Sequence, residues 1–519
     1  MGKRDNPVVL VLAIAVTVAI AGGAVWWLTK FAPGLVPNNS NQPDTNQKQV
    51  KLTILGDTFS GYSTFRSQAF QKAMSEVGIT VNYQDEFDQK KRAEQLNQGQ
   101  ADLIVTTLDQ FIQQKPQGKI VGLIDRTAGA DAVVLNTKKY PQLKSLLDLT
   151  QLVQQQRQQN QQLTITFAGD TPSEYLALVL STKFEAFKLS DFQVNKVTDA
   201  SDAWKLLQDP QQNVAVAVIW EPYVTKARQQ GYEVVLSSKD APGAIVDAII
   251  ASDKLIASQP AKISEFLEAY YRRIDANVRD ASQLQTQIAE DGKLSPGDAN
   301  AVLQGIEFFT AVEAKDWLTN GTLEKRIVST AAVLTLSGRL KQVPEKPQEL
   351  YSGEAIAKAA SNTQTLISLV RADNPELADR LAGKGKAIAT NKAISPSQIK
   401  KAPNIGNLQI RGEINFNLGS AELTSQGKET LNKLAQEIDQ FNEKTIAVRV
   451  IGHTSKVGDA DFNQQLSQQR ADATVNYLRS LKLKQNILAE GKGFTQTLPG
   501  IPPEDQRNQR TEIRLVRIN

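Results

Sequence analysis

The sequence predicts an α/β protein built from an N-terminal transmembrane helix, a two-lobed α/β domain and a smaller α+β domain. Three observations lead to this fold class: a long apolar run near the N-terminus, an alternation of strand and helix patterns through the middle of the chain, and a separate strand–turn–helix pattern near its end. With 519 residues, the chain is long enough for about three domains.

Composition excludes several classes of function. The 59 Lys and Arg residues nearly balance the 55 Asp and Glu residues, and no basic run is interleaved with aromatic residues, so we expect no nucleic-acid partner. The absence of cysteine excludes disulfides, thiolate metal sites and a lipidated cysteine. A single histidine and the lack of a Gly-x-Ser-x-Gly motif or paired carboxylates predict a protein that is not an enzyme and needs no metal or cofactor.

Residues 1–31 are predicted to be a single-pass membrane anchor. Lys3 and Arg4 precede an apolar run over residues 8–28, and about 20 such residues cross a bilayer as a helix. The basic end is expected to stay inside, with the bulk of the chain exported. A cleaved signal peptide with a small-residue site at residues 19–21 is the alternative. Residues 32–49 are rich in Pro, Asn and Gln and predict a flexible linker.

From residue 50 the chain alternates between strand and helix patterns, which predicts parallel sheets covered by helices in two lobes. The expected strands cover residues 50–56, 79–83, 101–105, 163–167 and 214–219. The expected helices cover residues 63–77, 90–97, 152–162 and 172–184.

Ligands of such sheets lie beyond the carboxyl ends of the strands, where helix N-termini present free N–H groups. Polar residues at these ends, with an aromatic–acidic pair after the last strand, form the candidate solute site. They are Asp57, Ser60, Ser63, Thr106, Thr107, Thr127, Asp131, Thr171, Ser173, Trp220 and Glu221. Their hydroxyls could donate hydrogen bonds to a small polar or anionic solute. Because the sequence shows no dense cationic pocket there, we expect a small organic solute and not a highly charged phosphate. For each residue alone, a helix cap or a core position is the alternative.

Three segments carry a resemblance to a known family. They are residues 96–102 (LNQGQAD), residues 125–134 (DRTAGADAVV) and Trp220-Glu221-Pro222-Tyr223. With them, residues 50–339 resemble a type II periplasmic substrate-binding protein of the nitrate, taurine and thiamine-precursor kind. The resemblance implies two lobes that close on a solute and, for an importer, docking to an ABC permease. Residues 340–405 follow as a proline-containing spacer with short helices at 354–370 and 376–381. A small helical element packed on the binding domain is the alternative.

The third part of the chain contains the only histidine. Residues 446–451 alternate like a strand, a polar turn with Gly452 and Gly458 follows, and a helix is expected to begin near Asn463. Five side chains of this stretch are expected to face one shallow cleft: His453, Thr454, Ser455, Asn463 and Arg470.

These residues closely resemble the OmpA-like peptidoglycan-binding domain, over residues 406–519. Further matches lie at residues 414–416, 419–423, 491–493 and 508–513. The resemblance implies that Arg470 binds the carboxylate of a diaminopimelate stem, since a guanidinium engages both carboxylate oxygens at once. The family's aspartate for the ammonium is replaced here by Ser455, so Asp459 or Asp461 becomes a candidate substitute, and binding is either weakened or lost.

Together these features predict a protein of a Gram-negative cell envelope. The anchor would lie in the inner membrane and the bulk of the chain in the periplasm, with a solute bound in the two-lobed cleft and peptidoglycan bound at the C-terminus. The alternative is a structural link between wall and membrane, in which the solute-binding domain docks a protein or has lost its ligand.

Overall fold

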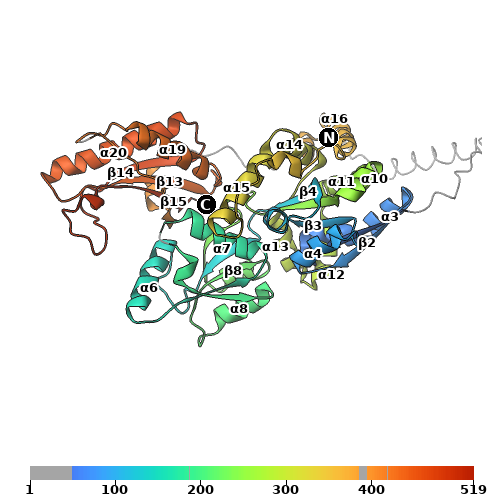
Figure 1. The fold of residues 1–519 in the computed structure, drawn as a ribbon, viewed down its shortest axis with the longest axis horizontal. Helices are drawn as coiled ribbons and strands as arrows, with labels where there is room; N and C mark the ends of the chain where they lie inside the picture. The colour runs from blue at the N-terminus through green and yellow to red at the C-terminus, as the bar shows by residue number, and fades with distance from the viewer. Residues whose placement is uncertain (1–49, 186, 385–393, 418, 519) are drawn as a thin grey trace, which may run out of the picture. The chain divides into compact units, whose positions relative to one another are not determined.

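The computed structural model describes residues 50–185, 187–384, 394–417 and 419–518, and residues 51–519 form one compact unit. The described residues form two α/β lobes followed by an α+β domain (Figure 1). The predicted anchor and linker lie outside these residues. Within the described ranges, no helix is both long and apolar enough to cross a membrane.

The sheet of the first lobe has the strand order β11-β4-β10-β3-β1-β2. Strands β1 and β3 are parallel, as predicted, whereas β10 runs antiparallel between β3 and β4. The expectation of a purely parallel sheet is therefore wrong. The strands are β1 (Val50–Gly56), β2 (Ile79–Asp85), β3 (Leu103–Thr107), β4 (Gly118–Thr127), β10 (Val246–Ser252) and β11 (Ile306–Phe308).

The sheet of the second lobe has the order β7-β6-β8-β5-β9, and here β5 is the strand that runs against its neighbours. Both antiparallel strands have the same origin: β5 receives the chain from β4 of the first lobe, and β10 receives it from β9 of the second. These two crossings join the lobes. The strands are β5 (Asp131–Leu135), β6 (Thr164–Ala168), β7 (Gln193–Val197), β8 (Val214–Trp220) and β9 (Glu233–Ser237).

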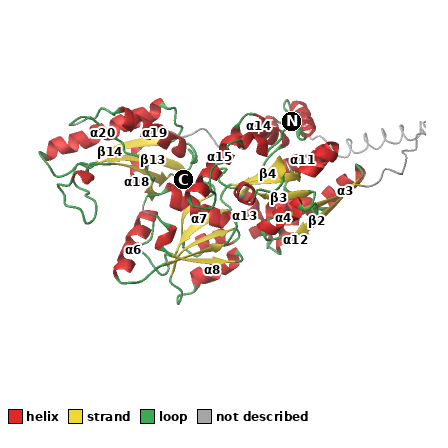
Figure 2. Ribbon diagram, viewed as in Figure 1, coloured by secondary structure: helices red, strands yellow, loops and turns green. Residues whose placement is uncertain are grey.

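Helices surround both sheets (Figure 2). The helix expected over residues 63–77 is broken at Ser67, whose extended backbone lets its hydroxyl accept from Phe70 N at 3.3 Å and cap a new helix. The helices of the first lobe are α2 (Ser63–Arg66), α3 (Gln68–Glu76), α4 (Gln89–Asn97), α5 (Leu108–Gln114), α10 (Asp253–Ser258), α11 (Pro260–Arg279), α12 (Ser282–Gly292), α13 (Pro296–Gln304), α14 (Ala311–Thr319) and α15 (Thr322–Leu336). In the second they are α6 (Leu146–Gln158), α7 (Pro172–Lys183), α8 (Ala200–Gln208) and α9 (Tyr223–Gln229).

The segment predicted as a spacer contains the short helices α16 (Ala357–Val370), α17 (Pro375–Leu381) and α18 (Pro396–Lys401). Helix α16 packs on α11 and α14, and Thr363 donates a hydrogen bond to the buried Asp275 at 2.7 Å. Ile367 and Leu381 pack with Val278 of α11 in one apolar cluster. This part of the segment is thus attached to the first lobe, the arrangement that the sequence left as the alternative.

The C-terminal sheet has the order β12-β15-β13-β14 and carries the helices α19 (Ser425–Ile438) and α20 (Ala460–Ser480). Its strands are β12 (Asn404–Asn407), β13 (Ile446–Gly452), β14 (Asn486–Gly491) and β15 (Thr511–Arg517). Residues 414–416 do not form the expected first strand: Phe416 makes a single bridge with Leu423, and β12 occupies the sheet edge instead. Helix α20 begins three residues before Asn463 because Asp459 caps it.

Two glycines let α20 lie close to the strands. Gly452 and Gly491 are partners in the parallel pair β13–β14. A Cβ atom at Gly452 would lie 2.2 Å from the carbonyl oxygen of Ser467, and one at Gly491 would lie 2.5 Å from the backbone nitrogen of Gln468. Because both obstacles are backbone atoms of one helix, any side chain would push α20 away.

We therefore expect Gly452→Ala to lower the free energy of unfolding of the C-terminal domain by about 1–3 kcal/mol, or more if the helix cannot shift. The measurement is thermal unfolding of the full chain followed by circular dichroism. Gly297→Ala is the control, because its Cβ would have no neighbour closer than 3.8 Å. Equal melting temperatures for the two variants would contradict the close approach.

Candidate functional site

The first candidate site is a row of buried polar side chains at the carboxyl end of the first lobe's sheet. Thr107 ends β3, and its register partner in β10 is Asp247, which in turn pairs with Asp125 of β4. Side chains of paired residues project from the same face of a sheet, so these three lie side by side. All three are buried.

The oxygen atoms of this row are short of hydrogen-bond donors. Both carboxylate oxygens of Asp125, the Oδ2 atom of Asp247 and the hydroxyl of Thr107 have no partner among the described residues. The Oδ1 atom of Asp247 accepts a hydrogen bond from the hydroxyl of Tyr62. Tyr62 belongs to the short helix η1 (Ser60–Tyr62), and a Cβ on its neighbour Gly61 would lie 2.2 Å from Asp125 Oδ2, so η1 covers the acids.

A further carboxylate lies where the two crossings meet. Asp131 begins β5, directly after the crossing from β4. The hydroxyl of Ser238, on the return crossing, accepts hydrogen bonds from the backbone nitrogens of Gly129 at 2.9 Å and Asp131 at 3.3 Å. The two connections between the lobes are therefore tied to each other beside Asp131.

Burial and mutual repulsion change the protonation of these acids. Burial, with the charges of Asp57, Asp109 and Asp131, raises the pKa of Asp247 to about 8. Burial, with the charges of Asp109 and Glu221, raises the pKa of Asp131 to about 7. The pKa of Asp125 is raised well above its ordinary value by burial and by Asp247 and Asp131.

The structure brings part of the predicted solute site to this place. Thr107, Thr127 and Asp131 lie there, Ser60 begins η1, and the hydroxyl of Ser173 is buried without a partner in the described chain. The other predicted residues have local partners or pack in the core. Asp57 pairs with Arg92, Ser63 accepts from Arg66, Thr106 donates to Gln89, Thr171 donates to the Ala168 carbonyl, Glu221 accepts from Thr225, and Trp220 packs on the second lobe's core.

Sequence reasoning missed three members of this site: Tyr62, Asp125 and Asp247. A signal was available for Asp125, which opens the DRTAGADAVV segment, because an acid in an otherwise apolar strand is unusual. The same signal was available for Asp247, an acid in the apolar run of residues 245–251. For Tyr62 no local pattern exists, since its position depends on the placement of η1.

The second candidate site lies after β13 in the C-terminal domain. Ser455 is buried, and its hydroxyl accepts a hydrogen bond from Gln509 Nε2 at 3.1 Å. The His453 imidazole is buried 3.3 Å from Glu512, and Thr454 is buried. Although burial raises the pKa of Glu512, His453 and the arginines at 510 and 514 lower it to about 2.

The remaining residues of the predicted cleft have separate tasks. Asn463 donates to the Val457 carbonyl at 2.9 Å and holds the turn, while Asp459 accepts from Phe462 N and caps α20. Arg470 is half-buried, donates from Nε to the Ser420 carbonyl at 3.0 Å and lies 5.3 Å from the ring centre of Phe416. No contact in the described residues joins Arg470 to Ser455, so a single cleft containing both stays a prediction.

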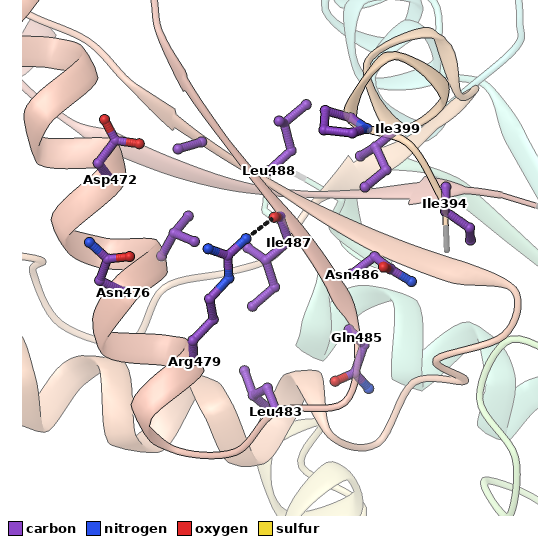
Figure 3. Close-up of a pocket in the computed structure, with 13 residues that line it drawn as sticks. Ile394, Ile399, Asp472, Asn476, Arg479, Leu483, Gln485, Asn486, Ile487 and Leu488 are labelled. Atoms are coloured by element: carbon purple, nitrogen blue, oxygen red, sulfur yellow. Dashed lines mark hydrogen bonds between the residues drawn. The ribbon is translucent and has the colours of Figure 1, made fainter. Parts of the chain in front are cut away.

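A different hollow is open on this domain (Figure 3). It measures about 440 Å³ and lies between α18, α20 and β14. Figure 3 shows Arg479 at its wall, where the guanidinium donates to the Ile487 carbonyl at 3.1 Å. None of the predicted site residues lines it.

Residues 415–511 match the model of the OmpA family. The chain carries an OmpA domain at its C-terminus. Outer membrane protein A of Shimwellia blattae is 33% identical over 92 residues, which are 18% of this chain and 38% of that protein. The protein of the same name from Serratia marcescens is 32% identical over 92 residues, 18% of this chain and 26% of its own. The chain thus matches well under half of these relatives' length.

The solved structures similar to this chain include the periplasmic aliphatic sulphonate binding protein SsuA from Escherichia coli. The match has 18% identity and a TM-score of 0.46, and it covers 58% of this chain and 92% of that one.

The raised pKa values of Asp131 and Asp247 predict how stability changes with pH. An unfolded aspartate has a pKa of about 3.9. Between that value and the folded pKa values of about 7 and 8, the folded protein binds more protons than the unfolded chain. The free energy of unfolding therefore falls as pH rises through this window. We expect the melting temperature to fall between pH 5 and pH 8.

Asp247→Asn should flatten this dependence, because the amide does not titrate. Asp280→Asn is the matched control: that carboxylate is exposed, and hydrogen bonds from Ser282 lower its pKa, so it is ionised throughout the window. Thermal unfolding of the full chain in buffers of equal ionic strength gives both slopes. A slope that Asp247→Asn leaves unchanged would show that this carboxyl does not hold its proton in the folded state.

Proposed function

We propose that this protein is a non-enzymatic component of the cell envelope that binds a small solute between two lobes and binds peptidoglycan through its OmpA domain. The observation that carries the proposal is the combination, in one chain, of an OmpA domain with a two-lobed α/β domain whose partnerless buried polar groups gather where the lobes are joined. Such gathering at the carboxyl end of a sheet is typical of a ligand site.

The peptidoglycan part of the proposal depends on Arg470. Its Nε atom is held by Ser420 and its plane lies near Phe416, so the two terminal nitrogens are pre-oriented as a fork for a carboxylate. The ammonium of the same stem lacks a formal counter-charge at Ser455. Gln509 completes a neutral pair with that serine. We infer weaker binding than in family members with the aspartate at this place.

The solute part of the proposal depends on movement about the crossings. Each lobe has its own sheet, and the chain passes between them in two short connections tied through Ser238, with α15 of the first lobe packed on α7 of the second. Two lobes connected this way close on a ligand by a hinge. With residues 1–31 as an inner-membrane anchor, the closed form would be presented to an ABC permease in the same membrane.

Sedimentation with purified sacculi tests the peptidoglycan part on the full chain. Arg470→Ala should reduce retention about tenfold, because a charge-assisted fork is lost. Arg479→Ala is the control: it lies nine residues further along α20, roughly 180° around the helix, and should not change retention.

The converse change should increase retention. Ser455→Asp supplies the missing counter-charge for the ammonium, and Gln509→Arg in the same chain gives the new carboxylate a partner in place of a buried, unpaired charge. If Arg470→Ala and the double variant both bind sacculi as the original chain does, these residues are not the peptidoglycan site.

A further inference from the structure

We propose that the solute bound between the lobes carries an ammonium or guanidinium group, which Asp125 and Asp247 receive. This inference rests on the proposed solute-binding function and names the class of its ligand. It differs from the expectation of a small polar or anionic solute, which came from the Ser and Thr hydroxyls at the strand ends.

The free hydrogen-bonding groups at the site are all able to accept. Asp125 offers two oxygens and Asp247 offers one, in adjacent strands, and the Thr107 hydroxyl completes the row. A buried polar atom without a partner costs free energy, and two neighbouring carboxylates add repulsion. A group with several N–H donors and a positive charge removes both costs at once.

The arginines near this end of the first lobe do not form ion pairs with Asp125 or Asp247. Among the described residues, Arg92 pairs with Asp57 at 2.9 Å and Arg66 with Asp291 at 2.9 Å. Arg126 neighbours Asp125 in β4, but it pairs with Glu307 and Glu313. None of these three arginines therefore pairs with an acid of the row. In their ionised form the two carboxylates would repel an anion and attract a cation.

Two features favour an organic cation over a metal ion. Within the described ranges, no three or more His, Asp or Glu side chains are grouped so that they could hold a metal. In addition, Phe59 and Tyr62 form an edge-to-face pair, with ring centres 5.2 Å apart, next to the acids. Aromatic rings attract organic cations through their faces and shield them from water.

A simpler interpretation is that Asp125 and Asp247 are a protonated pair that only fills the core. The two interpretations differ in what happens when a cation is offered. A protonated pair that is merely structural ignores it, whereas a binding pair ionises and releases protons as the ligand enters, because both acids have raised pKa values in the free protein.

The test is isothermal titration of the full chain with probes matched in shape and different in charge. Putrescine is compared with 1,4-butanediol, and butylguanidinium with butylurea, while ethanesulfonate and sulfate represent anions. We expect at least one cation to bind, its neutral partner to bind at least about tenfold more weakly, and the anions not to bind. Titrations in buffers of different ionisation enthalpy should show proton release on binding.

Asp125→Asn and Asp247→Asn should each weaken cation binding at least about tenfold, since the amide keeps the shape and loses the charge. Asp275→Asn is the control, a buried acid of the same lobe that lies on α11 away from the row. Burial raises its pKa to about 6, and like Asp247 it has one oxygen that accepts from a hydroxyl, here that of Thr363, and one oxygen without a partner. It should bind as the original chain does. The comparison of ligand pairs on the unaltered chain needs no variant and decides the charge preference by itself.

Binding of ethanesulfonate or sulfate, unaffected by either Asn variant, would overturn the cation inference and leave the solute-binding function standing. Equal binding of charged and neutral partners would do the same. Failure of every probe to bind would overturn both the inference and the solute-binding function, while the result with sacculi would still stand on its own.

Discussion

Two chain crossings between the lobes are the constraint on which the binding domain depends. Each crossing inserts a strand into a sheet against its direction, β5 into the second and β10 into the first. The inserted strand β10 lies between β3 and β4, so the residue at its start, Asp247, is placed between Thr107 and Asp125. A cluster of buried acids at the carboxyl end of the first lobe's sheet is thus a direct result of topology.

Burying such a cluster of acids lowers the stability of the folded protein, and a role in ligand binding would account for that cost. Carboxyl groups beside one another in a poorly solvated place retain protons near neutral pH, which lowers the repulsion but removes stability as pH rises. Tyr62 relieves one oxygen of Asp247, and η1 closes over the pair. The remaining acceptors are arranged as a ligand with N–H donors would require, in the position where open α/β sheets bind their ligands.

In the OmpA domain, glycines and turn residues hold the fold, while the side chain at Ser455 differs from the aspartate of the family. The close approach of α20 to β13 and β14 requires glycine at 452 and 491, and the turn between strand and helix is held by Asn463 and Asp459. Inside that turn, the Ser455–Gln509 hydrogen bond keeps the space filled with neutral groups. Arg470 keeps its fork. In the proposed peptidoglycan site, Arg470 would bind the carboxylate, whereas the ammonium beside it would have no formal counter-charge.

The sequence alone determined the classes of structure and most of the elements. Alternation of strands and helices, the glycines of the C-terminal domain and its motifs are local signals, and β1, β13 and the region of α20 follow from them. Tertiary structure decided what no local pattern contains. The antiparallel insertion of β10 and the partners of Asp247 depend on contacts between residues far apart in the chain. The periodicity of apolar residues indicates which face of an element is buried. Only the register between strands determines which charged groups are buried together, and that register decided the chemistry of the site.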